Sequence, residues 1–165
     1  TIRGRIKGGE PEVDLQPPTA LRPDAGISKL FGELGLGFVN TGVPHLVVRT
    51  ADAGLVDLGS RGPELRFHEN LPAGANVNWV SPSPDGAWRM RTYERGVEAE
   101  TLACGTGAVA CAVMLSTWGE AGEVTRLQTR SGRTLTVTLR RSEEGIRPSL
   151  AGEARIVFEG ELREI

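Results

Sequence analysis

The stretch from Ala108 to Leu115 contains only aliphatic, methionine and cysteine side chains, and it most constrains how the chain can fold. It lies in a predicted helix from Gly105 to Trp118, which Gly119 ends. A helix without a polar face cannot lie on the surface of a domain, because every side would expose apolar atoms to water. The rest of the chain must therefore surround this helix.

Short segments with alternating polar and apolar residues, separated by Gly and Pro turn signals, can supply strands for that shell. Strands are predicted around Val13 and Leu15 and at 38–39, 46–48, 76–80, 88–94 and 154–158, with a hairpin over 124–141 that turns through two residues at Ser131-Gly132. Residues 19–36 are predicted to be a loop with a short helix at 28–34, and further short helices are predicted at 53–58 and 64–68. The expected class is α+β, with strands curled around a central buried helix.

Length and charge bound the class of protein. With 165 residues, 39% of them apolar, the chain suits one ordinary globular domain. The formal net charge is −2 and no run of Lys or Arg occurs, so no nucleic-acid partner is expected. No segment approaches 18 consecutive apolar residues, so no contact with a membrane is expected.

Two cysteines, Cys104 and Cys111, belong to the apolar helix. Seven residues along a helix place their Cα atoms about 10 Å apart, which is too far for a disulfide. Both are expected to be free thiols, as in a reducing cytoplasm. Cys111 is expected to be a core residue.

Cys104 is expected to carry chemistry, because it opens the helix in the run CGTG. The first N–H groups of a helix have no partner within it and carry the positive end of its dipole. A thiolate there should have a pKa below its usual value of about 8.5. The N–H groups of Gly105 and Thr106 could also hold a carboxylate.

Taken alone, the other polar candidates are better explained by structural roles. Glu94 and Arg95 form a pair typical of a solvated strand end, and His45 after Pro44 suits a core or turn position. Asn76 follows a turn and suits a cap. Its neighbour Asn78 is predicted to point to the opposite face of the strand.

The run YERGVEAETLACGTGAVACAV resembles the signature of diaminopimelate epimerases around one of their two catalytic cysteines. The runs FVNTGVPHLVV, LPAGANVNWV, RSGRTLTV and GEARIVFEGEL also resemble family segments in the expected order, so the resemblance covers roughly residues 36 to 165. It implies stereoinversion of LL-2,6-diaminopimelate to the meso form, in lysine and peptidoglycan precursor synthesis. The implied mechanism uses two opposed cysteines as acid and base, without a cofactor and without a metal.

The resemblance also implies roles for individual residues. Cys104 matches a catalytic cysteine, with His45 and Glu94 supporting catalysis. The implied substrate contacts are Asn76, Glu94, Arg95, Gly105 and Thr106. The family commonly has Asn where this chain has Val43. Either Asn40 or Thr41 is then expected to supply that contact, or recognition of the distal end of the substrate is altered.

Two similarly built domains, each with strands around a central helix, make up the family enzyme. Residues 1–165 resemble the C-terminal one, with 1–20 near the crossover, and the cysteine-bearing N-terminal domain is expected before Thr1. The implied partners are diaminopimelate, that other domain and a second copy in a homodimer, in the cytoplasm. One domain alone is expected to be inactive.

Other functions remain open from the residues themselves. One is a related cofactor-independent isomerase or racemase of the same fold. Another is a cysteine hydrolase, in which Cys104 is the nucleophile, His45 the base, and Gly105 with Thr106 the oxyanion hole. A domain that only binds a ligand is a further alternative.

Overall fold

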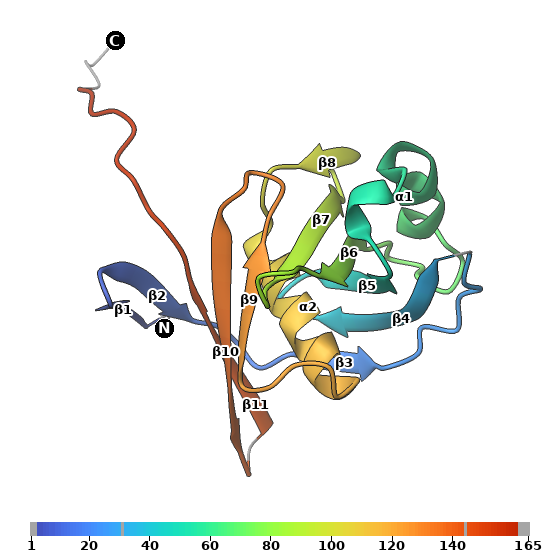
Figure 1. The fold of residues 1–165 in the computed structure, drawn as a ribbon, viewed down its shortest axis with the longest axis horizontal. Coiled ribbons are helices and arrows are strands. Elements are labelled where there is room, and N and C mark those ends of the chain that lie inside the picture. Colours follow the sequence, from blue (N-terminus) through green and yellow to red (C-terminus); the bar gives the residue numbers. More distant parts are fainter. Residues whose placement is uncertain (1–2, 31, 144, 162–165) are drawn as a thin grey trace.

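One large sheet wraps around a central helix in the computed structural model, which describes residues 3–30, 32–143 and 145–161 (Figure 1). The strands of the described residues are β1 Gly4–Lys7, β2 Glu10–Asp14, β3 Thr19–Arg22, β4 Glu33–Asn40, β5 Pro44–Thr50, β6 Asn76–Pro82, β7 Trp88–Glu94, β8 Ala99–Thr101, β9 Val124–Gln128, β10 Thr134–Ser142 and β11 Gly145–Ala151. Their order is β1-β2-β11-β10-β9-β7-β6-β5-β4-β3, and β8 pairs with β7 off this path. The pairs β5–β6 and β7–β9 are parallel.

The central helix is α2, Gly105–Thr117, and the prediction that it is buried on all sides is confirmed. Every residue from Gly107 to Leu115 is buried, and strands β4, β5, β6, β10 and β11 contact the helix. Trp118 ends it, and its indole Nε1 donates to the carbonyl of Pro23 over 3.0 Å. The predicted α+β class, with strands curled around this helix, is also confirmed.

Two short helices cover the outer face of the sheet over a second core that includes Leu65 and Trp79. They are the 3₁₀-helix η1, Ala53–Leu55, and α1, Leu58–Arg66. The prediction of separate helices at 53–58 and 64–68 was wrong, because α1 runs through Gly62 and Pro63. The carboxylate of Asp57 caps α1 early, and Gly62 lets the helix approach the ring of Tyr93, which a Cβ would strike.

Two further predictions, both for the segment 19–36, were wrong. Within 28–34 the described residues form no helix, and β4 begins at Glu33, whose carboxylate is held 2.9 Å from Arg61 in a nearly buried ion pair. Residue 31 lies outside the described residues. Residues 19–22 form β3 rather than a loop, because they pair with β4.

The last strand of the sheet is β11, and not the predicted segment 154–158. That segment alternates like a strand but pairs with no strand of the described residues, and Ile156, Val157 and Phe158 are 82%, 83% and 83% exposed. It extends away from the sheet (Figure 1). Pro148 hides the strand character of β11 in the sequence, yet it pairs opposite Leu139.

The predicted hairpin of β9 and β10 is confirmed, but the N–H of Thr129 donates to the carbonyl of Arg133 over 2.9 Å, which closes a turn of three residues rather than two. The N–H of Gly132 donates to the carbonyl of Thr129 over 2.9 Å, and Gly132 has φ +80°. A type I turn followed by one left-handed residue has this geometry, and glycine adopts the left-handed conformation without strain.

Candidate active site

The thiol of Cys104 takes the place of a capping side chain at the start of α2. Cys104 is extended, with φ −138° and ψ 109°, and its sulfur accepts the N–H of Gly107 over 3.4 Å. The hydroxyl of Thr106 lies 3.6 Å from the same sulfur. The prediction that Cys104 opens the buried helix and that Cys111 lies inside it is therefore confirmed, and both are free thiols.

Burial dominates the acidity of this thiol. Desolvation raises the pKa of Cys104, the hydrogen bonds from Thr106 and Gly107 lower it, and the negative charge of Glu94 raises it. The net shift is upward, so the expectation of a lowered pKa was wrong for this chain. A helix N-terminus favours a thiolate only as far as its donors offset the loss of water around the sulfur.

His45 lies behind Thr106 and does not contact the sulfur. It sits near the start of β5, fully buried, with Nε2 3.0 Å from the hydroxyl of Thr106 and Nδ1 3.1 Å from the side-chain nitrogen of Asn78. Burial, with the positive charge of Arg95, lowers the pKa of His45 to about 3. The imidazole is therefore neutral at pH 7, and it is not placed as the base of a cysteine–histidine pair.

Asn78 belongs to this cluster, although the sequence analysis placed it on the face opposite to Asn76. Residues two apart in a strand point to the same face, so that expectation was wrong. The amide nitrogen of Asn78 also donates to the carbonyl of Leu46 over 3.2 Å, and its oxygen accepts from Thr92 over 3.0 Å. Two polar residues two apart on one predicted strand were the signal that could have found it.

Asn76 and Arg95 form hydrogen bonds that connect the ends of neighbouring strands. The amide nitrogen of Asn76 donates to the carbonyl of Pro44 over 3.1 Å, and its oxygen accepts the backbone N–H of Arg95 over 2.9 Å. One N–H of the Arg95 guanidinium donates to the carbonyl of Ala73 over 3.1 Å. These bonds bring the start of β5, the start of β6 and the end of β7 together.

Glu94 ends β7, half-buried, and its negative charge acts on Cys104. Its carboxylate has no hydrogen-bond or ion-pair partner within the described ranges. The structure therefore brings the predicted residues Cys104, Glu94, Arg95, Gly105, Thr106, His45 and Asn76 to one end of the central helix.

Thr41 holds the turn before β5 against the helix, and its hydroxyl hydrogen is already used there. Its hydroxyl donates to the carbonyl of Thr106 over 3.0 Å. The side-chain oxygen of Asn40 accepts the N–H of Gly42 over 2.9 Å, so Asn40 keeps its amide nitrogen as a donor, whereas Thr41 keeps its hydroxyl oxygen as an acceptor.

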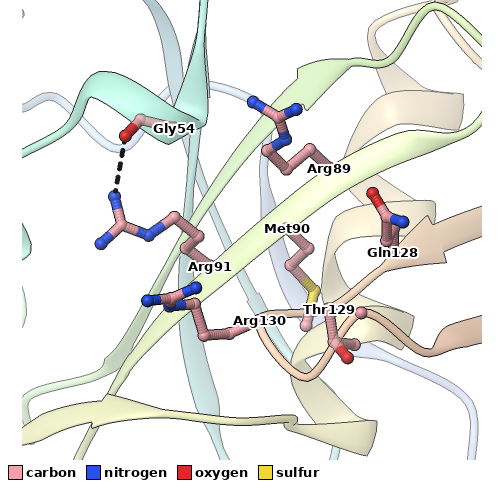
Figure 2. Close-up of a pocket in the computed structure, with 8 residues that line it drawn as sticks. Gly54, Arg89, Met90, Arg91, Gln128, Thr129 and Arg130 are labelled. Atoms are coloured by element: carbon pink, nitrogen blue, oxygen red, sulfur yellow. Dashed lines mark hydrogen bonds between the residues drawn. The ribbon is translucent and has the colours of Figure 1, made fainter.

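A separate pocket of about 400 Å³ lies between η1, β7 and the β9–β10 turn, and three arginines line it (Figure 2). Arg91 is already bound to the carboxylate of Glu100 and to carbonyls of η1, including that of Gly54. Arg89 is paired with Asp52 at 3.1 Å. Cys104 does not line this pocket, so the pocket and the thiol are distinct features of the molecule.

Comparison with known proteins places this arrangement in a family. The family model described as diaminopimelate epimerase matches residues 37–157. This range includes the thiol of Cys104, the imidazole of His45 and the strand ends that Asn76 and Arg95 connect. The chain belongs to the diaminopimelate epimerase family. It is 53% identical to the diaminopimelate epimerase of Gemmatimonas aurantiaca over 98% of this chain, and 42% identical to that of Aquifex aeolicus over 99%.

The chain spans about three fifths of the length of these curated relatives, 61% in each case. Among solved structures it is similar to a hydroxyproline epimerase from Agrobacterium vitis, with TM-score 0.62 and 19% identity over 92% of this chain and 54% of that one. It is also similar to a PhzF-family phenazine biosynthesis protein from Bacillus anthracis, with TM-score 0.65 and 13% identity over 92% and 60%. At these identities the structures establish the shared fold.

The part of the chain that the structure describes also bears on metal sites and membrane spans. No group of three or more His, Cys, Asp or Glu side chains in that part of the chain could hold a metal ion. No helix of residues 3–30, 32–143 and 145–161 is long and apolar enough to cross a membrane.

Proposed function

We propose that the protein carrying this chain inverts one α-carbon of LL-2,6-diaminopimelate to give the meso form, in lysine and peptidoglycan precursor synthesis. The observation that carries the proposal is Cys104 at the start of a buried helix, within a family named for this reaction. The chain supplies one of the two cysteines. A second cysteine, on an N-terminal domain of the same polypeptide, faces it across the substrate, and residues 1–165 form the C-terminal domain.

Inversion requires that a proton leaves one face of the α-carbon and that another arrives on the opposite face. The thiolate of one cysteine takes the α-proton, and the thiol of the other donates its proton to the carbanion. The upward shift in the pKa of Cys104 favours its thiol form, which suits the donor role in one direction. The two groups exchange roles in the reverse direction.

The carbanion needs stabilisation, because the α-proton of an amino acid is a very weak acid. The N–H groups of Gly105 and Thr106, in the first turn of α2, hold the α-carboxylate of the substrate, where negative charge grows. Glu94 and Arg95 offer charges to the ammonium and carboxylate groups of diaminopimelate, and the remaining N–H of Asn76 contacts it. Closing the second domain over this end of the helix excludes water.

His45 acts in this mechanism through Thr106, because its ring nitrogen bonds the Thr106 hydroxyl rather than the sulfur. This geometry disfavours the cysteine hydrolase, whose histidine must take the proton of its nucleophile. The fold alone is compatible with related isomerases, but the family match favours diaminopimelate as substrate. We place the enzyme in the cytoplasm, and a homodimer is its proposed assembly.

The test uses the complete polypeptide that contains this chain. It is incubated with LL-diaminopimelate in deuterated water, and both α-deuteration and the meso product are followed. Formation of meso product with deuterium at the inverted carbon supports the proposal, and its loss in Cys104→Ala assigns the thiol. Hydrolysis of an ester without epimerisation, blocked by iodoacetamide, would instead identify a cysteine hydrolase.

A further inference from the structure

A chain of four side chains leads from β6 to the sulfur of Cys104. It runs from Asn78 to His45, then to Thr106 and finally to Cys104, with separations of 3.1, 3.0 and 3.6 Å. The first three lie on different elements, β6, β5 and α2. The positions of the hydrogens along this chain decide whether the Thr106 hydroxyl donates a hydrogen bond to the sulfur.

The orientation of the Asn78 amide is determined by its surroundings. Its nitrogen faces the backbone carbonyl of Leu46 at 3.2 Å, where only a donor is favourable, and its oxygen faces the hydroxyl of Thr92 at 3.0 Å. Turning the amide over would place its oxygen against the oxygen of Leu46. The group that faces Nδ1 of His45 is therefore an N–H donor.

The N–H of Asn78 that faces Nδ1 determines the tautomer of the His45 imidazole. Nδ1 of His45 must accept, so the single hydrogen of the neutral ring lies on Nε2 and is donated to the Thr106 hydroxyl. The oxygen of Thr106 thereby receives one hydrogen, which leaves its own hydrogen available for the sulfur of Cys104, 3.6 Å away. The other tautomer would make Nε2 an acceptor and draw that hydrogen away from the sulfur.

The packing at the start of α2 accommodates this arrangement. A Cβ at Gly107 would overlap the side-chain oxygen of Asn78, so the absence of a side chain there lets the amide lie against the helix. Asn78 and His45 are both fully buried, so water does not replace these partners.

We infer that Asn78 is a positioning residue that, through the tautomer of His45, directs the Thr106 hydroxyl to donate a hydrogen bond to the thiolate of Cys104. The inference deepens the proposed function, since its value for catalysis rests on proton transfer by Cys104. Its effect on the thiolate does not depend on which substrate binds.

The first test measures how fast iodoacetamide alkylates Cys104 at pH 8, by peptide mass spectrometry, in the complete polypeptide. Asn78→Leu keeps the branching and the number of non-hydrogen atoms of the side chain but removes the donor, and Thr106→Val removes the hydroxyl. Each should slow alkylation about tenfold, because one hydrogen bond to a charged group is lost. Thr106→Ser keeps a hydroxyl and should restore most of the rate.

Coupling between the two sites separates this role from a merely structural one. With Thr106→Val already present, Asn78→Leu should slow alkylation no further, because the chain is already broken. Thr117→Val is the matched control, since its hydroxyl donates to the carbonyl of Val113 on the same helix, and it should leave the rate unchanged. Additive losses, or an unchanged rate in Asn78→Leu, would overturn the inference.

A second measurement needs no variant. Nitrogen-15 spectra of the imidazole of His45 should show the hydrogen on Nε2, and a hydrogen on Nδ1 would overturn the inference. Epimerisation without any effect of Asn78→Leu on alkylation would refute the positioning role and leave the proposed function standing. The expected alkylation pattern in a protein without epimerase activity would refute the function and support the positioning role.

Discussion

The backbone N–H of Gly107 donates to the sulfur of Cys104 over 3.4 Å, so the proposed catalytic atom is also the cap of the central helix. A substitution at Cys104 therefore acts on two properties, the acidity of the site and the start of α2. Serine separates them, because its hydroxyl caps a helix well but gives up its proton far less readily than a thiol.

Cys104→Ser should abolish most epimerisation while leaving the fold intact. The expected loss in kcat is about 10²–10⁴-fold, the usual contribution of one acid–base group. Thermal unfolding should stay close to that of the unchanged protein, since the cap remains. A variant that turns over at a near-normal rate would remove Cys104 from the mechanism.

The two cysteines should differ in kind when each is replaced by alanine. Cys104→Ala should affect catalysis, whereas Cys111→Ala should mainly lower stability, by about 1 kcal/mol or more, because Cys111 is fully buried. Urea denaturation and initial rates, measured on both variants, provide the comparison. Equal loss of activity at unchanged stability would contradict the core assignment of Cys111.

His45 should make the fold sensitive to acid. Its pKa falls from about 6.5 in the unfolded chain to about 3 in the folded one, so the unfolded state binds the extra proton between these values. The stability that the neutral ring contributes is complete above pH 6.5 and decreases as the pH falls toward 3, by up to about 1.4 kcal/mol per pH unit. Urea denaturation at pH 7, 5 and 4 measures this slope, and His45→Gln should flatten it. Identical slopes in the two proteins would contradict the role of burial at His45.

Gly107→Ala should destabilise the protein, although alanine is the better helix former. Helix propensity favours alanine by about 1 kcal/mol, but its Cβ would overlap the amide oxygen of Asn78. The expected net loss is about 1–3 kcal/mol, as for an overpacked core. Gly59→Ala, at an exposed position of α1, is the control: its Cβ would lie 3.3 Å from a carboxylate oxygen of Asp57, an exposed side chain that can shift, so its effect on stability should be much smaller. A stabilised Gly107→Ala variant would show that Asn78 does not pack against the helix as described.

The 165-residue chain on its own should fold but should not epimerise diaminopimelate. Its central helix is enclosed by its own strands, yet it offers one thiol to one face of the substrate. Val97 and Leu102, which flank the site in sequence, are 58% and 68% exposed, which favours self-association. Incubation with LL-diaminopimelate in deuterated water, with and without the separately expressed N-terminal domain, is the measurement. Steady formation of meso product by the chain alone would show that one thiol suffices.

The sequence by itself determined the central helix and the cysteine at its start. Nine consecutive buried residues leave no polar face, and this pattern can be read from residue types alone. The strands at 76–80 and 88–94 were likewise predictable, because alternation and turn residues are local signals. The resemblance of the CGTG segment added the family, which the comparisons establish.

Only the tertiary structure decided which polar groups meet and which strands pair. Asn78 and His45 lie 33 positions apart in sequence and meet because β5 and β6 are parallel neighbours. The segment 154–158 has the pattern of a strand but no neighbouring strand among the described residues, whereas β11, despite Pro148, pairs with β10. The direction of the pKa shift at Cys104 was likewise beyond the sequence. It depends on how much water the surrounding strands remove, which is a property of packing between distant segments.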